Sequence, residues 1–176
     1  MNRIENTHFK TGLQLADIPL PSTDSARPTA MLKRCPAHGV TPLVNAAELA
    51  KNLNIASFHV KDERNRMNLG SFKALGAAYV IASDAAEHDV SKTTYVSSSA
   101  GNHGLSIAAG AAAFGANAVI YLSATVPEDF AKRLRDLGAT VVRHGENYEA
   151  SMTGAIAAAA ENNWVLLSDS SWNGYT

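Results

Sequence analysis

The amino-acid sequence predicts an α/β fold in which helices cover both faces of a parallel, twisted sheet. Three observations support this class. Short apolar runs rich in β-branched residues alternate with helix-like runs of about a dozen residues. The alternation repeats from residue 58 to residue 167. With 176 residues, of which 46% are hydrophobic, the chain is also large enough to bury a core.

The amino-terminal stretch up to Pro42 carries five of the six prolines and shows little hydrophobic periodicity. This composition predicts an irregular arm rather than a folded unit. A helix is expected over Asn45–Asn52, with Asn45 or Thr41 available to cap it. Phe58–Val60 is strand-like, because two apolar residues flank the polar His59.

Helices and strands then alternate to the end of the chain. Pro127 suits the first turn of one helix, and Gly138 suits the end of the same helix. The predicted helices are Ser71–Ala86, Asn102–Phe114, Pro127–Leu137 and Tyr148–Glu161. The predicted strands are Thr93–Val96, Ala118–Leu122, Thr140–Val142 and Trp164–Leu167.

Composition excludes several classes of function. A formal net charge of −1 with scattered basic residues gives no sign of a nucleic-acid or membrane partner. The single cysteine, Cys35, excludes an intrachain disulfide, and no Cys/His cluster predicts a metal site. The sequence shows neither a signal peptide nor an apolar run of transmembrane length, so we expect a soluble cytoplasmic protein.

Lys73 and the loop Ser97–Gly104 carry the strongest functional signal. Each stands where a strand-like run leads into a helix-like run. Helix N-termini offer free N–H groups and a partial positive charge, which suit anions. A lysine amine placed there can attack an aldehyde, and the second loop can hold a carboxylate beside it. Schiff-base chemistry on an amino acid requires both groups.

The same segments resemble the fold-type II pyridoxal-phosphate enzymes. Ser71-Phe72-Lys73 followed by Ser99-Ala100-Gly101-Asn102-His103 is similar to their lysine and asparagine motifs. Among these enzymes, the stretches 62–76 and 169–176 look most like diaminopropionate ammonia-lyases. The resemblance implies pyridoxal phosphate as cofactor and a fold like that of the tryptophan synthase β-subunit. It also implies an arm and incomplete larger domain over residues 1–76, a smaller α/β domain over 77–170, and a return to the larger domain over 171–176.

The resemblance also implies roles for particular residues. Lys73 would bind the cofactor as a Schiff base and then take the substrate α-proton. Phe72 and Asn102 would contact the cofactor, with Asn102 bonded to its ring hydroxyl. Asp169 would serve in acid/base chemistry, although a turn-forming aspartate is the alternative on the residues alone. The substrate carboxylate would lie against Ser99, Ala100, Gly101, Asn102 and His103.

Two departures from the family pattern bear on function. Ammonia-lyases usually have an aspartate where this chain has Ala100, and this position looks more like a serine/threonine dehydratase. Family members are roughly twice as long, and their glycine-rich phosphate loop would come after residue 176. No Gly-Gly-Gly run occurs in this sequence. The phosphate site and half of the larger domain are therefore expected to be missing from these 176 residues.

These points leave four hypotheses. The first is half of an ammonia-lyase that converts 2,3-diaminopropionate, or a similar small amino acid, to pyruvate and ammonia. The second is a serine/threonine dehydratase or a β-replacement synthase. The third is a catalytically silent truncated domain or interaction subunit, and dinucleotide binding is a remote fourth. We expect negligible activity from the isolated chain, and either a homo-oligomer or a carboxy-terminal half bound to exposed apolar residues such as Leu43, Val44 and Leu49.

Overall fold

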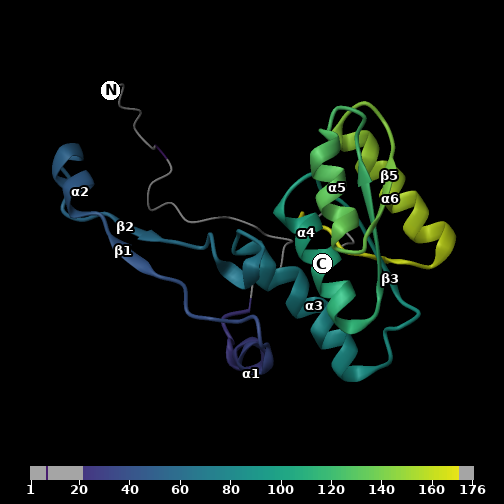
Figure 1. The fold of residues 1–176 in the computed structure, drawn as a ribbon, viewed down its shortest axis with the longest axis horizontal. Helices are drawn as coiled ribbons and strands as arrows, with labels where there is room; N and C mark the ends of the chain where they lie inside the picture. Colours follow the sequence, from purple (N-terminus) through teal and green to yellow (C-terminus); the bar gives the residue numbers. More distant parts are fainter. Residues whose placement is uncertain (1–6, 8–21, 171–176) are drawn as a thin grey trace.

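The computed structural model describes residue 7 and residues 22–170. A four-stranded parallel sheet with strand order β5-β4-β3-β6 forms its centre (Figure 1). The fold is therefore α/β with a parallel sheet, as the sequence predicts. The strands are β3 (Thr94–Ser98), β4 (Asn117–Leu122), β5 (Thr140–Arg143) and β6 (Val165–Leu166).

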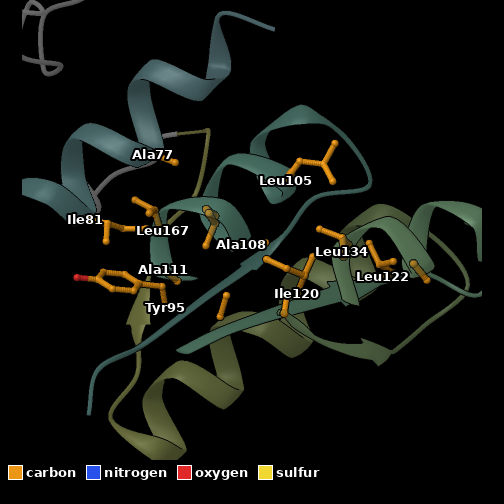
Figure 2. Packing of buried hydrophobic residues seen from close by; sticks show 14 residues of the cluster. Ala77, Ile81, Tyr95, Leu105, Ala108, Ala111, Ile120, Leu122, Leu134 and Leu167 are labelled. Carbon is orange, nitrogen blue, oxygen red and sulfur yellow. The ribbon is translucent and has the colours of Figure 1, made fainter. Parts of the chain in front are cut away.

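Successive side chains of a strand point to opposite faces of the sheet, so apolar residues appear on both faces. Helices cover both of them. One face carries Tyr95 and Ile120, which pack with three helices, α3, α4 and α5 (Figure 2). The other face carries Val96 and Val119, which pack against Ala155 of α6. These helices are α3 (Lys73–Glu87), α4 (Asn102–Phe114), α5 (Glu128–Asp136) and α6 (Tyr148–Asn162).

The core lies mainly between α3, α4, α5 and the sheet. Ile81, Ile107 and Leu134 are completely buried there. Full burial of such a side chain contributes about 1.5–3 kcal/mol. Gly110 lets α4 approach α3 closely, since a β-carbon at this position would lie 3.0 Å from Ile81 Cδ1. The packing of α3 against α4 fixes where Lys73, the first residue of α3, stands relative to the sheet.

The amino-terminal region contains more regular structure than the sequence predicts. A helix α1 (Ala26–Arg34) packs against α3, with an ion pair of 2.7 Å between Arg27 and Glu87. The prediction of an irregular arm is wrong for these residues. Pro28 lies in the first turn of α1, where a missing N–H costs no intrahelical hydrogen bond.

A second correction concerns the segment after Pro42. It forms a short antiparallel hairpin, β1 (Leu43–Asn45) with β2 (His59–Lys61), and α2 (Ala47–Leu53) lies between the two strands. The predicted helix therefore starts two residues later than expected, and Asn45 belongs to a strand. Thr41 does not cap α2 either, because its hydroxyl bonds the Glu63 carboxylate.

The hairpin and α2 project away from the α/β body, which leaves apolar side chains uncovered (Figure 1). Leu43, Val44 and Leu49 are 66%, 46% and 42% exposed, which confirms the expected exposure. Within the described residues, no helix combines the length and apolar character needed to cross a membrane. The expected return to a larger domain over 171–176 lies outside the described residues, and the division at residue 76 stays a prediction.

Candidate active site

The side chains of Lys73 and Asp169 meet, although 96 residues separate them in sequence. Lys73 Nζ donates to Asp169 Oδ2 at 2.6 Å. Lys73 begins α3, and Asp169 follows β6, which pairs with the central strand β3. The two side chains are 41% and 26% exposed, so the pair is open to solvent on one side. A lysine and a carboxylate therefore share one accessible position.

The surroundings of Asp169 favour its ionised form. Burial acts in the opposite direction, but the hydrogen bond from Lys73 and the nearby His103 outweigh it and lower the pKa of Asp169. His103 is itself buried, and its Nε2 lies 2.9 Å from the Leu167 carbonyl oxygen. Because a carbonyl only accepts, Nε2 carries the proton. The His103 side chain thus ties α4 to the segment that carries Asp169.

The loop from Ser99 to Gly104 is folded tightly over the end of β3. A β-carbon on Gly104 would lie 2.6 Å from the Ser99 carbonyl oxygen, so only glycine fits there without rearrangement. Gly101 precedes α4 as its N-cap in an extended conformation, and among the described residues its position supplies no side-chain cap. The first N–H groups of α4 therefore remain available to an anion.

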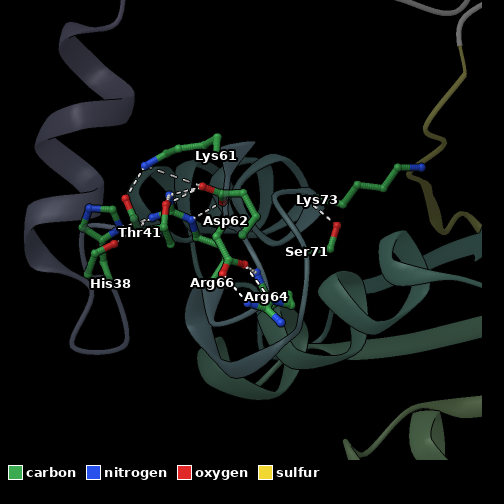
Figure 3. A network of polar contacts seen from close by, with 10 residues as sticks. His38, Thr41, Lys61, Asp62, Arg64, Arg66, Ser71 and Lys73 are labelled. Atoms are coloured by element: carbon green, nitrogen blue, oxygen red, sulfur yellow. Dashed lines mark hydrogen bonds and ion pairs between the residues drawn. The ribbon is translucent and has the colours of Figure 1, made fainter. Parts of the chain in front are cut away.

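A cavity of about 550 Å³ lies between the hairpin and the starts of α3 and α4. Ser71, Phe72 and Asn102 line one side, and Val44 and Val60 line the other. Gly70 and four charged residues complete the lining: Lys61, Asp62, Glu63 and Arg64. Lys73 is not among the lining residues, because its side chain points away from Ser71 towards the carboxy-terminal segment (Figure 3). The volume suits a small cofactor or substrate.

A buried arginine holds the wall of this cavity in place. The Arg66 guanidinium donates to both Glu63 carboxylate oxygens, at 2.6 and 2.8 Å, and to the Thr41 hydroxyl at 2.8 Å (Figure 3). The bonds from Arg66, and a further one that the Thr41 hydroxyl donates to Glu63, lower the pKa of Glu63 to about 2. A neighbouring pair, Asp62 with Arg64, lies at 2.6 Å. The network joins residues 38–41 to residues 61–66, and the sequence analysis missed it.

The structure thus divides the predicted residues into two groups. Lys73, Asp169 and His103 lie together, whereas Phe72 and Asn102 line the cavity. Ser99 is buried, and Ala100 is exposed. The apolar residues around Lys73, such as Phe72 and Leu75, favour a buried helix start, and this interpretation is wrong at Phe72, which is 63% exposed. Phe72 lines the cavity together with Val44 and Val60 of the hairpin.

Comparison with known proteins identifies relatives. The family described as pyridoxal-phosphate dependent enzyme matches residues 35–176. The diaminopropionate ammonia-lyase of Salmonella typhimurium strain LT2 is 31% identical over 166 residues, which are 83% of this chain and 41% of that protein. The biosynthetic L-threonine dehydratase of Pasteurella multocida strain Pm70 is 31% identical over 128 residues, which are 73% of this chain and 24% of that protein.

A solved structure agrees with these matches. The diaminopropionate ammonia-lyase of Escherichia coli, in its apo form, superposes with a TM-score of 0.78 and 27% identity. The superposition covers 86% of this chain and 47% of that chain. The present chain therefore spans about two fifths to one half of the length of these ammonia-lyases.

Proposed function

This chain belongs to the family of pyridoxal-phosphate-dependent enzymes, and we propose that it is part of an ammonia-lyase acting on 2,3-diaminopropionate or a similar small amino acid. The observation that carries the proposal is the contact of Lys73 with Asp169, 2.6 Å apart at the carboxyl edge of the sheet. An amine that binds a cofactor and a carboxylate that exchanges protons with substrate are the two groups such an elimination needs.

The residues present fit the cofactor. Lys73 supplies the amine, Asn102 an exposed amide, and Phe72 an apolar surface at the cavity rim. When bound, pyridoxal phosphate stabilises the electrons left on the substrate α-carbon when its proton departs. The phosphate carries about two negative charges and needs several N–H donors. We propose that a glycine-rich loop outside these 176 residues supplies most of them.

The chain's own residues would divide the remaining work. Lys73 takes the proton from the α-carbon. The uncapped N–H groups at the start of α4, with Ser99, Ala100, Gly101, Asn102 and His103 around them, hold the substrate carboxylate. Asp169 exchanges a proton with the amine that leaves the β-carbon. The product then adds water and loses a second ammonia, which gives pyruvate and two molecules of ammonia from 2,3-diaminopropionate.

Ala100 supports a second candidate, a serine/threonine dehydratase or a β-replacement synthase. A methyl group at this position offers no carboxylate to a substrate amine. The leaving group would then be a hydroxyl or another substituent on the β-carbon. A third candidate is a catalytically silent interaction subunit, and the exposed apolar residues of the hairpin support it.

We further propose that the exposed hairpin face binds the remaining share of the family fold, supplied as a carboxy-terminal half. Val40, Leu43 and Val44 are 95%, 66% and 46% exposed, and Phe72 extends the apolar surface to the cavity. Exposed apolar side chains of this kind favour association where they gather on one face. The solved relative has more than half of its length beyond the superposed part, and we propose that the corresponding segment covers this face.

One experiment tests the function and the partner together. The 176-residue chain is assayed for ammonia and keto acid from 2,3-diaminopropionate, L-serine and L-threonine, alone and with the carboxy-terminal half of the Salmonella ammonia-lyase. We expect negligible activity alone, and ammonia with pyruvate from 2,3-diaminopropionate in the mixture. Preferential turnover of threonine would favour the dehydratase. A complex that forms but acts on no substrate would favour the silent subunit.

A further inference from the structure

The buried hydroxyl of Ser106 joins α4 to the first turn of α3. It donates to the Ala74 carbonyl oxygen at 3.2 Å, one residue beyond Lys73. Serines inside helices commonly bond the carbonyl four residues back in their own helix, which here would be that of Asn102. Ser106 instead bonds a neighbouring helix, and its side chain is completely buried. The bond therefore fixes the helix turn that carries Lys73.

His103 makes a matching bond from α4 to the segment after β6. Its buried Nε2–H donates to the Leu167 carbonyl oxygen at 2.9 Å, two residues before Asp169. The Leu167 N–H in turn donates to the Val96 carbonyl oxygen of β3, also at 2.9 Å. Both polar groups of the Leu167 backbone are thus bonded, one to α4 and one to the sheet. The chain therefore leaves the sheet towards Asp169 from a fixed point.

The two bonds come from one side of α4. His103 and Ser106 are three residues apart, and residues at this spacing are neighbours on the surface of a helix. The contact of Lys73 with Asp169, at 2.6 Å, joins the same two segments that these side chains hold. A lysine side chain is flexible, and that of Lys73 is 41% exposed. Its contact with Asp169 therefore depends on how firmly the two backbones are held.

We propose that His103 and Ser106 are positioning residues that set the separation of Lys73 from Asp169. Ser106 places the turn that carries the amine, and His103 places the segment that carries the carboxylate. Loss of either bond lets one of the two groups move relative to the other. The catalytic meaning of this arrangement rests on the proposed function, whereas the separation itself can be measured without cofactor.

Cross-linking with a carbodiimide measures this separation in the complete 176-residue chain. The reagent joins a carboxylate to an amine only when the two groups are in contact. The amide between Lys73 and Asp169 is quantified by peptide mass after digestion. The amide between Lys132 and Asp136, a pair at 2.7 Å within α5, is the reference in every sample, because this contact does not depend on how α4 is packed.

We expect Ser106→Ala and His103→Leu each to lower the yield of the Lys73–Asp169 amide about three- to tenfold relative to the reference, the change expected from loss of one hydrogen bond. His103→Gln keeps an N–H donor in place of the imidazole and should restore most of the yield.

Ser151→Ala is the matched control for Ser106→Ala. Ser151 is also buried and hydrogen-bonded through its hydroxyl, but it lies on α6 and its partner is Ser98, at 2.6 Å. This variant should leave the yield unchanged. Unchanged yields in both Ser106→Ala and His103→Leu, or an equal loss in Ser151→Ala, would overturn the proposal. So would the absence of the amide from the unmodified chain.

The same variants separate this inference from the proposed function. In the complex with a carboxy-terminal half, Ser106→Ala should lower kcat about tenfold at nearly unchanged KM, because a misplaced base slows only the chemical step. Lower amide yields in a chain whose Lys73 never takes up pyridoxal phosphate would refute the proposed function and support the positioning. Normal cofactor uptake with unchanged amide yields would refute the positioning alone.

Discussion

The Lys73 amine and the Asp169 carboxylate lie 2.6 Å apart at the junction of α3 with the segment after β6. The contact depends on the strand order, because β6 lies next to β3 and carries its carboxyl end to the start of α3 and α4. The Lys73 side chain must leave this partner before its amine can reach the 550 Å³ cavity that Ser71 and Phe72 border. Under the proposed function, Asp169 exchanges a proton with the substrate once Lys73 has moved away from it.

Asp169→Asn tests whether this carboxylate takes part in the chemistry. The amide cannot exchange protons as a carboxylate does, so turnover in the complex with a carboxy-terminal half should fall about 100-fold or more. Attachment of pyridoxal phosphate to Lys73 should persist. Asp136→Asn, at an exposed carboxylate paired with Lys132 on α5, is the matched control. Equal turnover by the unmodified complex and the Asp169→Asn complex would exclude Asp169 from catalysis.

Gly104→Ala and Gly76→Ala test how tightly the loop over β3 is built. Both glycines are in the first turns of helices, but only at Gly104 would a β-carbon collide with backbone, 2.6 Å from the Ser99 carbonyl oxygen. Gly104→Ala should lower the free energy of unfolding by about 1–3 kcal/mol. Gly76→Ala, with open space around it, should raise it by roughly 0.5–1 kcal/mol. Urea unfolding of both variants measures this, and similar values for the two would contradict the loop geometry.

Glu63 should make the cavity wall sensitive to acid. Its pKa is lowered from the ordinary value of 4.5 to about 2, so its stabilising effect is complete above 4.5 and disappears as the pH falls towards 2. Glu63→Gln should therefore be less stable than the unmodified chain at neutral pH, and the difference should shrink over this range. Glu87→Gln, in an exposed pair with Arg27, should cost little at any pH. The urea midpoints of both variants are measured across this pH range. The same pH dependence in Glu63→Gln and Glu87→Gln would refute the role of Glu63.

The sequence predicts the α/β body well, because its signals there are local. Strands such as Ala118–Leu122 are apolar runs between helix-like segments, and the helix over Asn102–Phe114 is observed with those bounds. The strand expected at Phe58–Val60 is observed as β2, one residue further along the chain. Its partner β1 was missed, because three residues are too few to show a period of two. The contact of Lys73 with Asp169 follows from strand order, and the Arg66 network joins residues 25 to 28 positions apart. Local patterns do not encode either of them.

Ala100 should set the preference for the configuration of the substrate. Because position 100 carries no carboxylate, Lys73 is the base that we expect to remove the α-proton, and it can reach this proton in only one of the two enantiomers. The complex should turn over D-2,3-diaminopropionate about 100-fold more slowly than the L-form, which is the usual contribution of a general base. Ala100→Asp should raise the rate on the D-form and leave that on the L-form nearly unchanged. Equal rates on both enantiomers by the unmodified complex would contradict this role.

The central claim is that Lys73 binds the cofactor, and borohydride reduction tests it most directly. The 176-residue chain is incubated with pyridoxal phosphate, reduced, digested and analysed by peptide mass. The account predicts that the label concentrates on the peptide with Lys73 and disappears from that peptide in Lys73→Ala, while Lys132→Ala leaves it unchanged. A label spread evenly over the surface lysines, or equally abundant in Lys73→Ala, would contradict the account.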